Sequence, residues 1–126
     1  MDKNVWVVDD DESIRWVLEK GLSDGGMDVQ TFDSANKVIK KLETENPHLI
    51  LTDNRMPGSS GIDLLDIVKE LRPVIPVIIM TAHSDLDSAV ESYEHGAWEY
   101  LPKPFDIEEA LSTVSYTHLT LPTTCT

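Results

Sequence analysis

Residues 5–26 read VWVVDDDESIRWVLEKGLSDGG, and this stretch decides the fold class. Its first four residues are apolar and end at a run of acids, which is typical of a short buried strand. Apolar residues then recur at helical spacing, at Ile14, Val17, Leu18 and Leu22. Asp11 or Ser13 offers an N-cap for that helix, and the glycines at 25 and 26 offer its end. The stretch therefore predicts a strand, a helix and a turn in succession.

The same alternation continues to the end of the domain. Further strands are predicted at residues 29–32, 48–52, 77–80 and 97–101, and further helices at 35–42, 64–71, 86–93 and 107–114. Apolar strands that alternate with helices form parallel sheets covered on both faces, with right-handed crossovers. We therefore expect an α/β fold, a doubly wound parallel sheet of five strands with five helices.

Composition limits the class of protein. The chain has 126 residues, which is room for one domain at about 150 residues per domain. Its 10 Lys and Arg stand against 23 Asp and Glu, a formal net charge of −13, which repels nucleic acids and anionic membranes. The single Cys125 excludes a disulfide framework, and Pro76 interrupts the most apolar stretch. We expect a cytoplasmic domain that binds neither nucleic acid nor membrane directly.

Side chains suited to phosphoryl chemistry follow four of the five predicted strands. They are Asp9, Asp10 and Asp11 after the first strand, Asp53 after the third, Thr81 after the fourth and Lys103 after the fifth. Any one of them alone is more simply explained as a helix cap, strand filler or surface charge. In doubly wound sheets, however, functional groups gather at the carboxyl ends of the strands, so their coincidence favours a shared site.

Carboxylates crowded at that edge would repel one another by about 4 kcal/mol per close pair at an effective dielectric constant near 20. A divalent cation with oxygen ligands relieves the repulsion, and Mg²⁺ prefers a site held by one or two carboxylates and a phosphate. Asp53 would then act as a carboxylate nucleophile of the aspartyl-phosphate kind. Mg²⁺ and Lys103 would neutralise the charge on the transferred phosphoryl group, and the Thr81 hydroxyl would donate to one of its oxygens.

Four separated blocks resemble the signature blocks of bacterial response-regulator receiver domains. They are VVDDDESIRWVL at 7–18, LTDNRMPGSSG at 51–61, VIIMTAHSD at 77–85 and EYLPKPFD at 99–106. The match covers about residues 4–114, and the residues in these blocks are most similar to those of nitrogen-regulatory NtrC-type activators. The resemblance implies a flavodoxin-like sheet with strand order 2-1-3-4-5 and a cis peptide bond between Lys103 and Pro104.

The same resemblance assigns roles to residues of this chain. It implies Asp53 as the phosphoacceptor and Asp9 and Asp10 as the acidic pair, which would hold Mg²⁺ together with Asp53. The backbone carbonyl of Arg55 is implied as a further Mg²⁺ ligand. Asp11 is left with two interpretations, as a cap of the first helix or as the partner of a metal-bound water.

Three further residues complete the implied site. Thr81 and Lys103 are the implied phosphate partners, and Tyr100 is the aromatic residue that changes exposure on activation. Space vacated by Thr81 would let Tyr100 turn inward and shift the fourth helix and its neighbours.

The implied function is a phosphorylation switch of a two-component system. A sensor histidine kinase donates the phosphoryl group in a Mg²⁺-dependent reaction, and hydrolysis later resets the domain. The domain would thus promote its own phosphorylation and dephosphorylation without being a conventional enzyme. Further implied partners are an output domain outside this sequence, concerned with transcription and nitrogen regulation, and a homodimer formed on phosphorylation.

Two other functions compete with this interpretation. A receiver-like docking module that signals without phosphorylation would not need the set of Asp10, Asp53, Thr81 and Lys103. A phosphohydrolase with an aspartyl nucleophile would usually have a second acidic residue, the general acid, two residues after the nucleophile. In this chain Arg55 occupies that position.

The last twelve residues, SYTHLTLPTTCT, depart from the pattern. They contain no charged residue, five Thr and Pro122, so we predict that the helix of residues 107–114 does not continue into them. We assign residues 1–114 to the receiver domain and 115–126 to an atypical tail. The tail is either a frayed native terminus or a segment foreign to the domain, and we favour the second interpretation.

Overall fold

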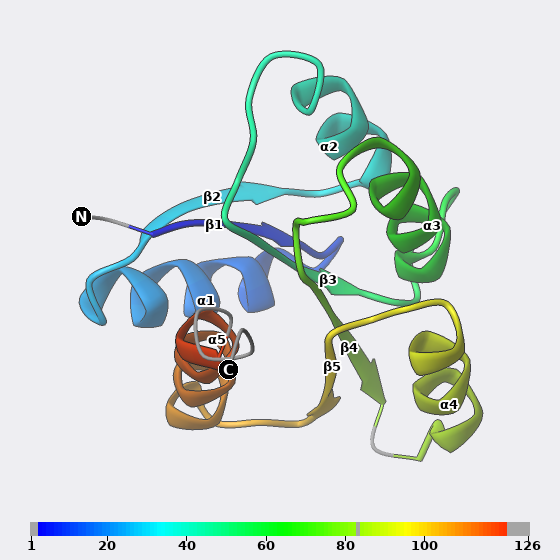
Figure 1. Ribbon diagram of the computed structural model, residues 1–126. Helices are drawn as coiled ribbons and strands as arrows, with labels where there is room; N and C mark the ends of the chain where they lie inside the picture. The colour runs from blue at the N-terminus through cyan, green and yellow to red at the C-terminus, as the bar shows by residue number, and fades with distance from the viewer. Residues whose placement is uncertain (1–2, 83, 121–126) are drawn as a thin grey trace.

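Helices cover both faces of a parallel sheet in the computed structural model, which describes residues 3–82 and 84–120 (Figure 1). The strands of the described residues are β1 (Asn4–Val8), β2 (Asp28–Phe32), β3 (Leu49–Asp53), β4 (Val77–Ala82) and β5 (Glu99–Lys103). The helices are α1 (Glu12–Asp24), α2 (Ala35–Lys41), α3 (Gly61–Leu71), α4 (Leu86–Glu94) and α5 (Ile107–Thr120). The strand order is β2-β1-β3-β4-β5, and every pairing is parallel. The predicted fold class and strand order are confirmed.

Strands β1, β3 and β4 each contribute to two hydrophobic cores because successive side chains point to opposite faces of a sheet. In β1, Trp6 and Val8 pack into the core under α2 and α3, whereas Val5 and Val7 pack into the core under α1 and α5. Figure 1 shows α1 and α5 together on one side of the sheet and α2, α3 and α4 on the other. Burial on both faces explains why β1, β3 and β4 are largely apolar rather than alternating, whereas the edge strands β2 and β5 carry more polar residues.

The polar groups predicted for the site lie at the carboxyl ends of these strands. Asp53 is the last residue of β3, and Lys103 is the last residue of β5. Thr81 lies inside β4, which extends to Ala82. Because β3, β4 and β5 are neighbours in the sheet, the hydrogen bonds between these strands position the backbone atoms of Asp53, Thr81 and Lys103 close to one another.

The first helix begins as its sequence indicates. Asp11 is the N-cap of α1, and its Oδ1 accepts a hydrogen bond from the backbone N–H of Ser13 at 2.8 Å. This contact supports the capping interpretation of Asp11. Gly25 forms the C-cap, where the backbone turns after the helix.

The fifth strand begins two residues later than predicted. The backbone N–H of Ala97 bonds to Ser92 O at the end of α4, so Ala97 belongs to the turn. β5 then lies at the edge of the sheet, a position that tolerates Pro102 because its missing N–H faces no further strand. The predicted cis peptide bond between Lys103 and Pro104 is confirmed.

The prediction that the last helix stops at residue 114 is wrong, because α5 continues to Thr120. The hydroxyls of Thr113 and Thr117 each bond at 2.8 Å to the carbonyl four residues earlier, which satisfies them inside the helix. Val114 and Thr117 are buried, so packing outweighs the weak helix propensity of threonine. Residues 121–126 lie outside the described residues, and the origin of the tail stays a prediction. Among the described residues, every helix is too short or too polar to cross a lipid bilayer.

Gly61 offers a test of how tightly α3 meets the site. A Cβ at Gly61 would come 2.4 Å from the backbone oxygen of Asp53, whereas one at Gly25 would meet the movable end of Leu111. We expect Gly61→Ala to lower the free energy of unfolding by about 1–3 kcal/mol, because backbone cannot yield as a side chain can. Gly25→Ala is the matched control and should cost less. Urea unfolding measures both variants. If Gly61→Ala and Gly25→Ala unfold at the same urea concentration, the close contact between Gly61 and the backbone of Asp53 is contradicted.

Candidate functional site

The site is built around carboxylates at the ends of the two central strands. Asp9 directly follows β1 and is fully buried, and Asp53 ends β3 with 8% of its surface exposed. Asp10 lies beside Asp9 and is exposed. One carboxylate oxygen from each of the three lies within 4.8 Å of the others. The structure therefore brings together the three carboxylates that sequence reasoning assigned to one site.

Lys103 supplies the positive charge of this cluster. Its Nζ lies 3.0 Å from Asp9 Oδ2 and 3.0 Å from Asp53 Oδ1. Because β4 lies between β3 and β5, the lysine side chain has to cross over one strand to reach these oxygens. One ammonium thus bridges carboxylates from two different strands.

Asp9 is held by further contacts as well as by Lys103. Its Oδ1 accepts from the backbone N–H of Asp11 at 2.9 Å, and its backbone carbonyl accepts from Arg15 Nη1 at 2.7 Å. The start of α1 therefore fixes the Asp9 carboxylate. Asp10 is exposed and is the more accessible member of the acidic pair.

The environment opposes full ionisation of Asp53. Burial raises the pKa of its carboxyl, the hydrogen bond from Lys103 lowers it, and the charges of Asp9 and Asp10 raise it again. The net pKa lies above the ordinary value of 3.8. At Lys103, burial lowers the pKa, but the contacts with Asp9 and Asp53 outweigh burial and leave the pKa raised. The cluster carries excess negative charge that Lys103 only partly neutralises.

A cavity of about 200 Å³ opens beside the Asp53 carboxylate. Asp53, Thr81, Lys103 and Arg55 all line it, and Thr81 is 3% exposed. The cavity is large enough for a tetrahedral anion of phosphate size, with a carboxylate, a hydroxyl and an ammonium around it. These are the groups expected for phosphoryl transfer.

Tyr100 lies apart from this cavity. It is half-buried on β5, and its ring meets the ring of Tyr93 on α4 edge to face at a centroid distance of 5.6 Å. Tyr93 also donates a short hydrogen bond to Glu99, and burial together with this bond raises the pKa of Tyr93 to about 12. The predicted switch residue is thus placed against α4 rather than against the reacting groups.

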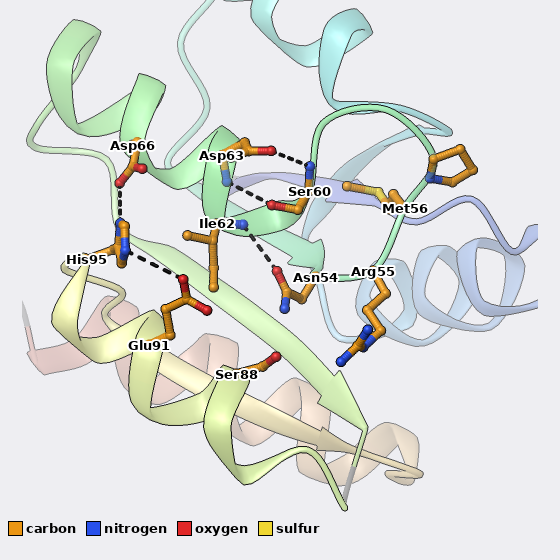
Figure 2. Close-up of a pocket in the computed structure, with 11 residues that line it drawn as sticks. Asn54, Arg55, Met56, Ser60, Ile62, Asp63, Asp66, Ser88, Glu91 and His95 are labelled. Carbon is orange, nitrogen blue, oxygen red and sulfur yellow. Dashed lines mark hydrogen bonds and ion pairs between the residues drawn. The ribbon is translucent and has the colours of Figure 1, made fainter.

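Two contributors to the site were not found from the sequence. Asn54 is buried and fastens the loop after β3 to α3, since its Oδ1 accepts from Ile62 N at 3.3 Å and its backbone carbonyl accepts from Gly61 N at 2.9 Å. Asp85 caps α4 and accepts from Arg55 Nη2 at 2.8 Å. Figure 2 shows the exposed Arg55 side chain turned away from the loop toward α4. The position of Asn54 next to Asp53 was a usable signal, but nothing in the sequence pairs Arg55 with Asp85.

Comparison with known proteins places these features in context. A family model described as the response regulator receiver domain matches residues 5–115. The DNA-binding transcriptional regulator NtrC of Proteus hauseri is 58% identical over 111 residues, and that of Escherichia coli (strain K12) is 54% identical over 110. These alignments cover 88% and 87% of this chain but only 24% of each relative. The chain therefore spans about a quarter of the length of the curated relatives it matches.

A solved structure gives the same comparison in three dimensions. The apo form of the receiver domain of nitrogen regulatory protein C superposes with a TM-score of 0.85 at 51% identity. The superposition covers 95% of this chain and 97% of that chain. The likeness therefore extends over the whole sheet and its helices, including the edge that carries the acidic cluster.

Removal of the bridging ammonium should destabilise the fold in a pH-dependent way. We expect Lys103→Met to lower the free energy of unfolding at neutral pH by roughly 2 kcal/mol, because Asp9 and Asp53 lose their counterion. This loss is smaller than for a fully buried ion pair, since the Lys103 side chain is partly exposed. The loss should shrink as pH falls through the raised pKa of Asp53, where the carboxyl becomes neutral. Urea unfolding at neutral pH and at about pH 4 measures both values.

Lys20→Met is the matched control for this experiment. Lys20 reaches Asp24 only at 4.0 Å, and both side chains are well exposed, so its removal should change stability little at either pH. Equal losses for the Lys103 and Lys20 variants would show that the bridge does not stabilise the cluster.

Proposed function

The chain belongs to the response-regulator receiver family, and we propose that Asp53 accepts a phosphoryl group and thereby switches the domain between two signalling states. Receiver domains of NtrC-type regulators act in phosphorylation-dependent signalling. The observation that carries the assignment to Asp53 is its place at the end of β3, 3.0 Å from Lys103 and on the wall of a cavity shared with Thr81.

Asp53 suits the role of nucleophile. Its carboxylate needs no base to remove a proton, and it faces a cavity rather than bulk solvent. In the proposed transfer from a phosphohistidine, a carboxylate oxygen forms a bond to phosphorus while the bond from phosphorus to the histidine nitrogen breaks. Attack of water on the acyl phosphate later releases inorganic phosphate and restores the carboxylate.

The chemistry of the donor set fits Mg²⁺. Receiver domains generally bind this ion at an acidic pocket, and here Asp9, Asp10 and Asp53 offer hard oxygen ligands within 4.8 Å of one another. The ion, when bound, neutralises charge on the phosphoryl oxygens and on the carboxylates. We propose Asp9, Asp10 and Asp53 as ligands, together with the backbone carbonyl of Arg55. The contacts of Asp9 with Lys103 and α1 also orient the cluster.

Lys103 and Thr81 are proposed to hold the phosphoryl group after transfer. The ammonium already lies at hydrogen-bond distance from Asp53, so it can move to a phosphoryl oxygen without leaving the site. The Thr81 hydroxyl can donate to a second oxygen from the neighbouring strand. The gained charge of roughly −1.5 to −2 would draw both groups inward.

This inward movement is the proposed start of the switch. A shift of Thr81 along β4 would free space next to β5, and Tyr100 would turn into it and lose its contact with Tyr93 on α4. Taking such an equilibrium from 1% to 99% needs about 5.5 kcal/mol of differential stabilisation. The partners proposed for the complete protein are a sensor histidine kinase and an output domain that regulates transcription, because the relatives bear the name of a DNA-binding transcriptional regulator.

Asp53→Asn tests the phosphoacceptor directly. With a small phosphodonor and Mg²⁺, intact-mass measurement should show one added phosphoryl group on the native chain and none on the variant, because an amide is a poor nucleophile. Asp11→Asn is the matched control: the same chemical change two residues from Asp9, at a helix cap that Asn can also form. It should label normally. Undiminished labelling of Asp53→Asn would refute the assignment, and no labelling of the native chain would favour a docking module.

Mg²⁺ alone should stabilise the folded chain. At a metal concentration ten times the dissociation constant, binding adds about 1.4 kcal/mol to the free energy of unfolding. Emission of Trp6 should change in the same titration, because this buried residue lies on the strand that leads to Asp9. Asp10→Asn should weaken both effects, and Asp11→Asn should leave them unchanged. A response of equal size in the two variants would contradict the proposed ligand set.

A further inference from the structure

Helix α4 is attached to the sheet by few apolar contacts. Its buried residues are Ser88, Ala89 and Ser92, which are all small. Its aliphatic side chains Leu86 and Val90 are 68% and 51% exposed, and Tyr93 is its one large side chain whose ring meets a ring of the sheet, that of Tyr100. Small buried side chains remove little apolar surface from water, so the hydrophobic effect holds this helix weakly. Polar contacts at its ends therefore have more influence on its position than they would on α1 or α3.

A polar groove, rather than an apolar seam, separates α4 from α3. Its volume is about 630 Å³, and it runs from the loop after Asp53 to the end of α4. Figure 2 shows acidic and hydroxyl side chains from both helices along it, with His95 and Asp66 meeting across one end. His95 and Asp66 are thus the contact that joins the C-terminal end of α4 to the middle of α3.

His95 makes this contact with both ring nitrogens near carboxylates. Nδ1 lies 2.7 Å from Asp66 Oδ1 on α3, and Nε2 lies 3.9 Å from Glu91 Oε2 on α4. His95 is also the C-cap residue of α4, where the negative end of the helix dipole favours a cation. The doubly protonated imidazolium suits this position because only that form donates from both nitrogens.

The charges around His95 come from both helices. On α3, Asp66 bonds to the ring and Lys69 lies over the adjacent Gly96; on α4, Glu91 and Glu94 are the nearby acids. The hydrogen bond with Asp66 is the largest influence and raises the pKa of His95. Desolvation is the next largest and lowers it, and the charges of Asp66, Glu91 and Glu94 raise it again, so that the net pKa is raised. The acids therefore outweigh the single lysine.

We propose that the Asp66–His95 bridge is a pH-sensitive clasp that holds α4 against α3 and opposes displacement of α4 more strongly at acid than at alkaline pH. The clasp itself is a property of the unphosphorylated chain. Its consequence for signalling rests on the proposed function, in which phosphorylation of Asp53 displaces α4. Alkaline pH would then favour the switched state at a given level of phosphorylation.

The direction follows from the protonation states. The pKa of His95 is higher with the clasp closed than with it open, so protonation favours the closed state. That contribution is complete below the ordinary histidine pKa of 6.5 and disappears as pH rises through the raised value. Because both partners are exposed to solvent, we expect the opening of α4 to increase only about two- to fivefold across this range.

Hydrogen exchange of α4 amides in the unphosphorylated chain, without Mg²⁺, tests the clasp separately from phosphoryl transfer. After correction for the intrinsic pH dependence of exchange, protection of α4 should fall two- to fivefold between about pH 6 and pH 8, while protection of α1 stays constant. In His95→Gln, α4 should show the weaker protection at both pH values. His95→Lys keeps a cation and should retain the stronger protection at both.

A proton NMR titration of the His95 ring in the same chain supplies the second readout. Its pKa should lie above 6.5 in the native chain and fall toward that value in Asp66→Asn, with a smaller fall in the matched control Glu94→Gln. The proposal is overturned if α4 protection changes with pH equally in the native chain and in His95→Gln, or if Asp66→Asn leaves the histidine pKa in place. Neither result would bear on labelling of Asp53, which is measured independently.

Discussion

The contact of one ammonium with two carboxylates at the end of the sheet is the constraint on which the rest of the site depends. Lys103 lies 3.0 Å from both Asp9 and Asp53, and Asp10 adds a third carboxylate nearby. Unit charges of like sign about 4 Å apart repel by roughly 4 kcal/mol at an effective dielectric constant near 20. A single lysine cannot balance three carboxylates, and this excess negative charge is the physical basis of the proposed Mg²⁺ binding and phosphoryl transfer.

The sheet makes this unfavourable cluster possible. Strands β1, β3 and β4 are buried on both faces and form the centre of the molecule, and the carboxyl ends of β1, β3 and the edge strand β5 carry Asp9, Asp53 and Lys103. The same sheet attaches α1 and α3 with large apolar side chains but holds α4 through small residues and polar contacts. The molecule thus combines a candidate site at the edge of the sheet with one helix that is held by few apolar contacts, which is the arrangement that the proposed two-state switch requires.

Much of this could be predicted from the sequence, because the period of the apolar residues and the residues at the strand ends are local signals. Contacts between residues far apart in the sequence could not be predicted in this way. Arg55 meets Asp85, and Asp66 meets His95, across about thirty residues, and no sequence pattern pairs them. The end of α5 was mispredicted for a different reason. Threonine disfavours helices in isolation, but burial of Thr117 and its bond to a backbone carbonyl reverse that preference in the fold.

The most direct test of the central claim is the titration of the Asp53 carboxyl carbon by ¹³C NMR, with and without Mg²⁺. Without the ion, the carboxyl should titrate above its ordinary pKa of 3.8, because burial and the neighbouring carboxylates oppose its charge. Saturating Mg²⁺ should move its pKa below that value, since a bound cation favours the carboxylate. A carboxyl that titrates at its ordinary pKa and does not respond to Mg²⁺ would contradict the account.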